Sequence, residues 1–298
     1  MKRILIFSLV NIAIVVTLSV LVEVVFALCG ANVQEVFGDY AYIAVFALVF
    51  GFGGAFISLL LSKTIAKWST GAKLVTGEEG EDERWLVDTV EELARTANVK
   101  TPEVAIYEGA PNAFATGAFK NHALVAVSTG IMRQMTRSEL RAVLGHEMSH
   151  VTNGDMVTMT LVQGVLNTFV IFISRVAAWM LSNAMKGKDD RGYSRRGGNW
   201  AYYMLARLFE IVLGLLAAII ACWYSRKREF AADAGSARLL GSPMPMVAAL
   251  QRLGNLQPGV LPDSMKAFGI ASAKKESLFA THPAIERRIE ALMRNYSA

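Results

Sequence analysis

The chain has 298 residues and a formal net charge of +5, with 53% hydrophobic and only 18% charged residues. With glycine counted and tyrosine left out, the apolar share is roughly 58%, against about 45–50% in soluble proteins. This excludes an intrinsically disordered protein, and two cysteines, Cys29 and Cys222, are too few for a disulfide scaffold. Basic residues flanking membrane segments explain the positive charge without nucleic acid as a partner. We therefore expect an integral membrane protein.

Two apolar runs near the N-terminus predict transmembrane helices at about residues 4–26 and 40–62, within the segment 1–63. No small-residue cleavage pattern follows the first run, so we interpret it as an uncleaved anchor and not as a signal peptide. The basic residues around this pair lie on one side of it: Lys2, Arg3, Lys63, Lys67 and Lys73. The positive-inside rule then places the N-terminus and the chain after residue 62 in the cytoplasm.

Two later runs, at about 156–181 and 201–225, predict a membrane-embedded hairpin covering 156–225. The uncharged core of the second run is short, because 15 helical residues span only ~22 Å of a ~30 Å hydrocarbon layer. Five basic residues in the connection 186–196 also oppose its export. Whether the hairpin crosses the membrane twice or stays shallow is left open. We expect Arg175 and Glu210, charges in apolar surroundings, to pair with each other.

The polar segments have the pattern of an α+β domain. In residues 64–155, positions 84–97 form an amphipathic helical pattern, and 103–107 and 123–128 are short β-rich runs. Thr136 and Glu139 fit a capping box that opens a helix extending to about Val151. Residues 226–298 read as mostly helical. The predicted fold class is therefore α+β, mainly helical, with a polar domain built from two separate segments.

The motif that carries chemistry is His146-Glu147-Met148-Ser149-His150, inside the capped helix. Histidines four residues apart lie on one helix face, so both imidazoles can reach one metal ion. Glu147 is placed to reach a water molecule on that ion. Zinc-dependent hydrolysis uses this arrangement, because the metal lowers the pKa of the water and a carboxylate takes its proton.

A third ligand has to come from elsewhere, and the candidate is Glu229, on a helix that continues from the fourth apolar run. Asp233 lies one turn further on the same face and can accept a hydrogen bond from a ligand histidine. The alternative is that both acidic residues pair with basic neighbours such as Arg226 on a solvated face. Spacing alone does not decide between the two.

Together the motifs 146–150, 153–155 (Asn-Gly-Asp) and 229–233 (Glu-Phe-Ala-Ala-Asp) strongly resemble those of the HtpX-type membrane metalloproteases. These are gluzincins related to the type I CAAX prenyl proteases. The resemblance covers almost the whole chain, including the segments 112–117 and 281–283. It implies a cytoplasmic catalytic domain with one zinc ion per chain, in the inner membrane of a bacterium. It also implies a stress-response endopeptidase acting on damaged membrane proteins.

Carried over residue by residue, the resemblance makes His146, His150 and Glu229 the zinc ligands. Glu147 becomes the general base, and Asp233 the residue that orients His146. Both sides of the later hairpin must then open to the same compartment, because Glu147 and Glu229 serve one site.

Two further residues each allow two interpretations. Asn112 opens a segment, 112–117, that resembles the family's strand beside the cleft, where an exposed edge can hold a substrate. The alternative interpretation is that Asn112 begins a turn before a buried Phe114. His282 is a candidate for stabilising the oxyanion, or else it simply precedes the last helix before Pro283.

Two non-hydrolytic functions are the alternatives to a protease. One is a membrane scaffold or chaperone with a structural zinc site, but such sites are closed by four protein ligands. Both cysteines lie far from the motif. The other is a transporter, which the position of the ionisable cluster outside the apolar runs disfavours.

Overall fold

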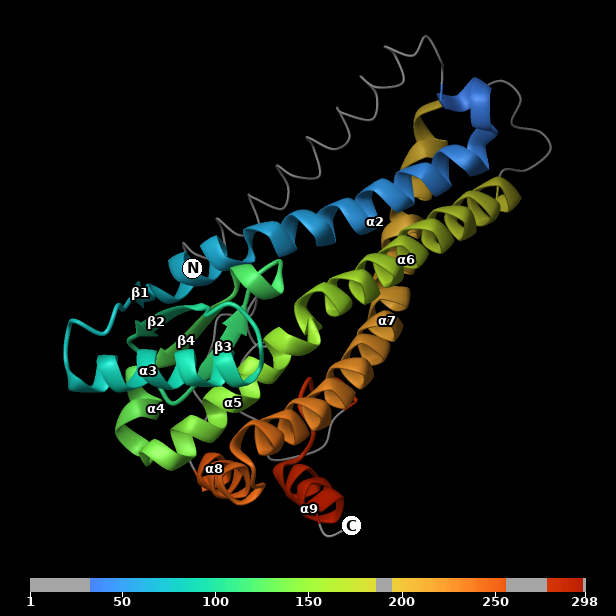
Figure 1. Cartoon of the computed structure of the whole chain (residues 1–298). Coiled ribbons are helices and arrows are strands. Elements are labelled where there is room, and N and C mark those ends of the chain that lie inside the picture. The colour runs from blue at the N-terminus through green and yellow to red at the C-terminus, as the bar shows by residue number, and fades with distance from the viewer. Residues whose placement is uncertain (1–32, 186–194, 256–277, 297–298) are drawn as a thin grey trace. The chain divides into compact units, whose positions relative to one another are not determined.

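A computed structural model of the chain describes residues 33–185, 195–255 and 278–296. The first predicted transmembrane helix, at 4–26, and most of the connection 186–196 lie outside the described residues. By contacts the chain forms two compact units, Met1–Ser58 with Thr160–Ile220 and Leu59–Met159 with Ala221–Ala298. The prediction of a mainly helical α+β chain is confirmed: the elements in Figure 1 are helices except for one small sheet.

Three long helices carry the apolar runs: α2 (Val33–Thr70), α6 (Asp155–Met185) and α7 (Arg195–Leu240). Each contains a stretch long and apolar enough to cross a membrane, by length and composition. α7 continues unbroken through Glu229, as the sequence predicted.

Within the first unit, α2 and α6 approach closely at two glycines. A Cβ atom on Gly51 would collide with Thr168, and one on Gly164 would meet the ring of Phe52. The predicted pair of charges is also confirmed, since Arg175 Nη2 lies 3.9 Å from Glu210 Oε1. This pairing lowers the free-energy cost of placing two charges in apolar surroundings.

The second unit contains a four-stranded sheet in the order β1-β2-β4-β3. β1 (Lys73–Leu74) is antiparallel to β2 (Glu103–Tyr107), which is parallel to β4 (Leu124–Ser128). β3 (Ala113–Thr116) is antiparallel to β4 and forms the edge of the sheet. β2 and β4 match the two β-rich runs of the sequence, whereas β1 is only two residues long and gave no comparable signal.

Helices cover both faces of this sheet. α3 (Glu81–Thr96) and α5 (Arg137–Asn153) pack on one face, beside the short α4 (Thr129–Gln134), as Figure 1 shows. The C-terminal part of α2 contributes Ala66 to a smaller apolar cluster on the other face, against Phe114 and Tyr107. A 3-10 turn at Lys120–His122 connects β3 to β4.

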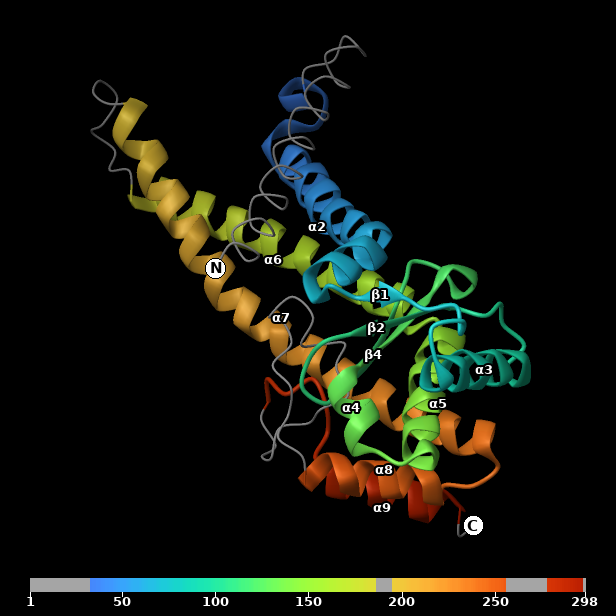
Figure 2. The same ribbon diagram turned by 90° about the vertical axis from the view of Figure 1, so that its left-hand side faces the viewer.

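The boundaries of α5 follow from its end residues. The predicted capping box is confirmed, since Thr136 Oγ1 accepts from the Glu139 N–H while the Glu139 carboxylate accepts from the Thr136 N–H. The helix ends at Gly154, which adopts a left-handed φ of 69° that favours glycine. Beyond α7, α8 (Met244–Asn255) and α9 (Ile285–Tyr296) pack against each other, and Figure 2 shows them side by side.

Candidate metal centre

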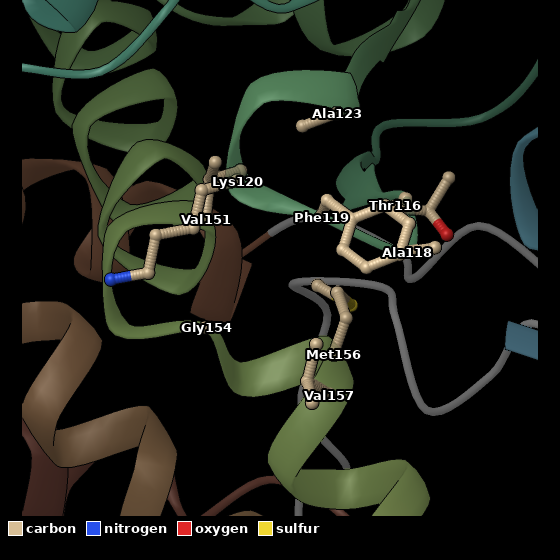
Figure 3. Close-up of a pocket in the computed structure, with 10 residues that line it drawn as sticks. Thr116, Ala118, Phe119, Lys120, Ala123, Val151, Gly154, Met156 and Val157 are labelled. Carbon is tan, nitrogen blue, oxygen red and sulfur yellow. The ribbon is translucent and has the colours of Figure 1, made fainter. Parts of the chain in front are cut away.

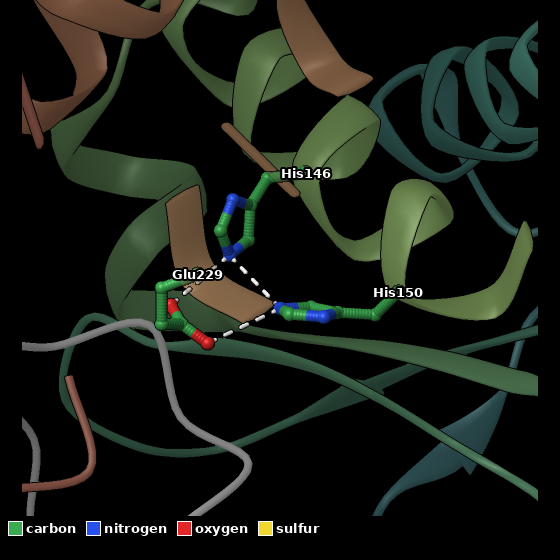
Figure 4. Close-up of side chains that lie close together, drawn as sticks. All are labelled: His146, His150 and Glu229. Carbon is green, nitrogen blue, oxygen red and sulfur yellow. Dashed lines mark hydrogen bonds and ion pairs between the residues drawn. The ribbon is translucent and has the colours of Figure 1, made fainter. Parts of the chain in front are cut away.

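α5 brings the two motif histidines to one point. The Nε2 atoms of His146 and His150 lie 3.2 Å apart, and the two imidazole planes are nearly perpendicular. Glu229, from α7, completes the group: its Oε2 lies 3.5 Å from His146 Nε2 and its Oε1 lies 3.4 Å from His150 Nε2. All three side chains are buried and point toward one another in Figure 4.

Small residues allow α7 to approach α5 this closely. A Cβ atom on Gly235 would collide with Ser149, and one on Gly145 would lie 2.8 Å from Ser236 Oγ. Ser236 Oγ also donates a hydrogen bond to the carbonyl of Ala142, 2.7 Å away. Gly235 lies less than two turns beyond Glu229. This contact therefore fixes the position along α5 at which the Glu229 carboxylate meets the histidines.

The other nitrogen of each imidazole faces a carboxylate. Asp233 Oδ1 lies 2.9 Å from His146 Nδ1, the partner that the family resemblance implied for this histidine. Asp155 Oδ2 lies 2.6 Å from His150 Nδ1, a contact that sequence reasoning missed. The local signal for it was the turn at Asn153-Gly154, because the left-handed Gly154 returns the chain toward the end of α5. Both contacts favour a proton on Nδ1, so Nε2 is the nitrogen that would serve as the ligand atom when a metal ion is bound.

Arg288, from α9, is a second residue that sequence reasoning missed. It is fully buried, and its guanidinium donates to both oxygens of Asp233, at 2.6 and 2.8 Å. Its pKa is raised, because Asp233 and Glu229 favour the charged form more strongly than burial opposes it. An arginine in a helix with many charged residues resembles a surface residue in sequence, so nothing local indicated this contact.

The two remaining candidates, His282 and Asn112, are placed differently. His282 Nδ1 lies 2.9 Å from Glu229 Oε2, so His282 belongs to the cluster. Asn112 is buried at the start of β3, where its Oδ1 accepts a hydrogen bond from the Ala113 N–H. Phe114 is fully buried, as the turn interpretation expected, and residues 113–116 also form the edge strand.

Glu147 lies between the two histidines in sequence. Its side chain is buried and accepts a hydrogen bond from the backbone of Ala115. Burial raises its pKa above the usual value, and the neighbouring imidazoles His146 and His150 offset only part of that rise. A carboxylate with a raised pKa is a better proton acceptor than an exposed one.

The electrostatics of the cluster favour an added cation. Burial lowers the pKa of each motif histidine, but the adjoining carboxylates raise it more, so both values lie above normal. Four buried carboxylates surround the histidines, against the one fully buried guanidinium of Arg288. They are Glu147, Asp155, Glu229 and Asp233. Two Nε2 atoms and a carboxylate oxygen lie within 4.8 Å of one another, a donor set that fits a metal ion.

A small, largely apolar hollow lies at the downstream end of β3. Thr116, Phe119 and Lys120 line it from the sheet side, and Val151 and Met156 from the helices (Figure 3). No metal-directed carboxylate or imidazole contributes to its lining. We therefore assign the chemistry to the buried cluster and not to this hollow.

The sequence profile of peptidase family M48 matches residues 81–295. The chain belongs to peptidase family M48. Two relatives called "Protease HtpX homolog" show the same affiliation over nearly the full length. The Verminephrobacter eiseniae protein is 54% identical over 295 residues, and the Albidiferax ferrireducens protein 52% over 294, with 98% of each chain covered in both cases.

This M48 chain is thus a membrane metalloprotease, as the resemblance to HtpX-type proteins predicted. Its fold is similar to that of a crystal structure of S. mikatae Ste24p, with a TM-score of 0.61 at 17% identity. That likeness covers 98% of this M48 chain and 67% of the Ste24p chain, and it concerns the fold alone. The scaffold and transporter alternatives are therefore not supported.

Proposed function

We propose that the metal is zinc and that the enzyme is an endopeptidase acting on damaged or misfolded membrane proteins. Its site would face the cytoplasm at the inner membrane of a bacterium. The observation that carries the proposal is the donor set: two Nε2 atoms and the Glu229 carboxylate converge while carboxylates hold both Nδ1 atoms. Catalytic zinc sites use three such ligands and leave one position for water, whereas structural sites use four.

Zinc bound to His146, His150 and Glu229 would polarise the substrate carbonyl and lower the pKa of a bound water toward ~7. Glu147 takes a proton from the attacking water and passes it to the leaving amine. The hydrogen bond from the backbone of Ala115 holds this carboxylate beside the edge strand. The general base therefore lies beside the strand that would bind the substrate backbone.

β3 supports binding of the substrate as an extended strand. It is the last strand of the sheet, although its four residues are buried in this structure, and Ala115 at its centre lies beside Glu147. An added strand is held by main-chain hydrogen bonds, which any sequence can supply once it is unfolded. Asn112, at the start of β3, would contact the substrate near this edge. We infer that exposure of an extended segment, more than the identity of one side chain, selects the peptide bond to be cut.

Two features support action on membrane proteins at the cytoplasmic face. The basic residues after the second apolar run favour the cytoplasm for the chain that follows it. His150 precedes the apolar run of α6 by six residues and Glu229 follows that of α7 by four, so short stretches of chain join the site to both runs. Loops and frayed ends of membrane proteins would become accessible close to such runs.

Metal analysis of the protein in detergent tests the donor set. The wild type should carry one zinc per chain and cleave unfolded casein, losing activity with a chelator and regaining it with zinc. Glu229→Ala should lose most of the metal, because two histidines alone hold zinc poorly. Glu290→Ala, an exposed glutamate of α9, serves as the matched control. Full zinc content and activity in the Glu229 variant would require a different third ligand.

A further inference from the structure

One face of α7 contacts the C-terminal part of the chain residue by residue. Four residues of α7, spaced four, three and four apart, share this face: Cys222, Arg226, Glu229 and Asp233. Their partners, in the same order, are Phe279, Ala280, His282 and Arg288. The segment 278–288 therefore follows α7 in the same direction, with the metal centre part-way along this contact.

The contacts before the metal centre involve the backbone of residues 278–280, which form a turn and no regular element. Arg226 Nη1 donates to the carbonyl of Ala280 at 2.7 Å and to that of Leu278 at 3.2 Å. Cys222 Sγ donates weakly to the carbonyl of Phe279, 3.4 Å away. A hydrogen bond from a charged donor is stronger than one from a thiol, so Arg226 is the main anchor of this segment.

His282 lies two residues after this anchor. One extended residue spans at most ~3.6 Å, so a fixed Ala280 carbonyl restricts His282 to a small region beside Glu229. The imidazole is buried there, with Nδ1 2.9 Å from Glu229 Oε2, although neither ring nitrogen makes a hydrogen bond of regular geometry within the described residues. A ring nitrogen left free next to a metal centre can donate to an oxyanion that forms there.

We propose that Arg226 is a positioning residue for the peptidase reaction: it fixes residues 278–280 and thereby holds His282 at the metal centre. The inference rests on the proposed function of that centre. Arg226 belongs neither to the metal-directed group nor to the carboxylates around it. Its removal should therefore leave the zinc content unchanged and lower kcat, because His282 would no longer be held where the oxyanion forms.

The test is a double-mutant cycle of Arg226→Gln and His282→Ala in the full chain, with kcat, KM and zinc content measured for each. Each single variant should lower kcat by about 10- to 100-fold, the cost of a misplaced catalytic group, with KM nearly unchanged. The double variant should be no slower than His282→Ala alone, since Arg226 acts through that histidine. Lys227→Gln is the matched control, because Lys227 is the exposed neighbour whose ammonium stacks on Trp223.

A second variant separates positioning from folding. Arg226→Lys keeps a cationic donor for one carbonyl and should recover part of the lost kcat. Diethylpyrocarbonate should also modify His282 faster in Arg226→Gln than in the wild type or in Lys227→Gln. Losses that multiply in the double variant, or an unchanged rate of His282 modification, would overturn the proposal. A wild type without zinc, or without activity, would instead overturn the proposed function.

Discussion

Arg288 donates one hydrogen bond to each carboxylate oxygen of Asp233, Nη2 to Oδ1 at 2.6 Å and Nε to Oδ2 at 2.8 Å. Asp233 Oδ1 in turn lies 2.9 Å from His146 Nδ1. The pair is separated by 55 residues and joins α9 to the metal centre through α7. The last helix of the chain is thus coupled to the orientation of a metal-directed histidine.

Replacing Arg288 by leucine should strongly destabilise the protein. The change leaves the buried carboxylate of Asp233 without its cation, and breaking a buried pair from one side costs about 3–5 kcal/mol. Denaturant unfolding in detergent measures the free energy of unfolding, with Arg294→Leu, an exposed arginine of the same helix, as control. A loss no larger than in the control would show that Asp233 needs no partner from α9.

Asp155→Ala should weaken zinc binding. The substitution frees the ring of His150, and removing such a carboxylate usually costs about 10–100-fold in metal affinity. Asp233→Ala should have an effect of similar size through His146. Competition titration with a zinc chelator gives both affinities, and Asp88→Ala, an exposed aspartate of α3, is the control. Wild-type affinity in the Asp155 variant would mean that His150 is oriented by other contacts.

Gly235→Ala should destabilise the contact between α5 and α7 by about 1–3 kcal/mol, as overpacking does. The added methyl group would collide with Ser149. Gly214→Ala, in the same helix, meets no atom within 4 Å and should be neutral or slightly stabilising, since alanine favours helix. Thermal unfolding of the two variants provides the comparison. Equal stability of both would show that α7 can move away from α5 without cost.

Where local signals set the structure, the sequence was sufficient. The capping box of Thr136 and Glu139 fixed the start of α5, and the four-residue spacing of His146 and His150 placed both rings on one face. The strands β2 and β4 followed from their β-rich composition. These features depend on neighbours within a few residues, and their energies do not require knowledge of the rest of the chain.

Contacts between distant segments were harder to predict. Glu229 and Asp233 looked equally suited to a solvated face, and only the glycine and serine contact between α5 and α7 turns them toward the histidines. Arg288 gave no signal, because burial of an arginine depends on a partner 55 residues away. Arg226 was read as a possible partner of Glu229, whereas its guanidinium binds backbone carbonyls after residue 277.

The connection 186–196 should stay at the membrane surface or be exported only marginally. Its five basic residues oppose translocation, and the uncharged core of the following run is short. The test is labelling of a cysteine at Gly192 by an impermeant reagent in intact cells, with Cys29 and Cys222 replaced by serine. Strong labelling from outside would refute the shallow hairpin and establish a double crossing. Both results leave Glu147 and Glu229 on the same side.

The central claim is that Glu147 is the general base of a zinc peptidase, and Glu147→Gln tests it most directly. The variant keeps His146, His150 and Glu229, so it should bind the same one zinc per chain as the wild type. Casein cleavage should fall by about 10²–10⁴-fold or more, the usual cost of losing a general base. Appreciable cleavage by this variant, purified free of other proteases and with its full zinc content, would contradict the account.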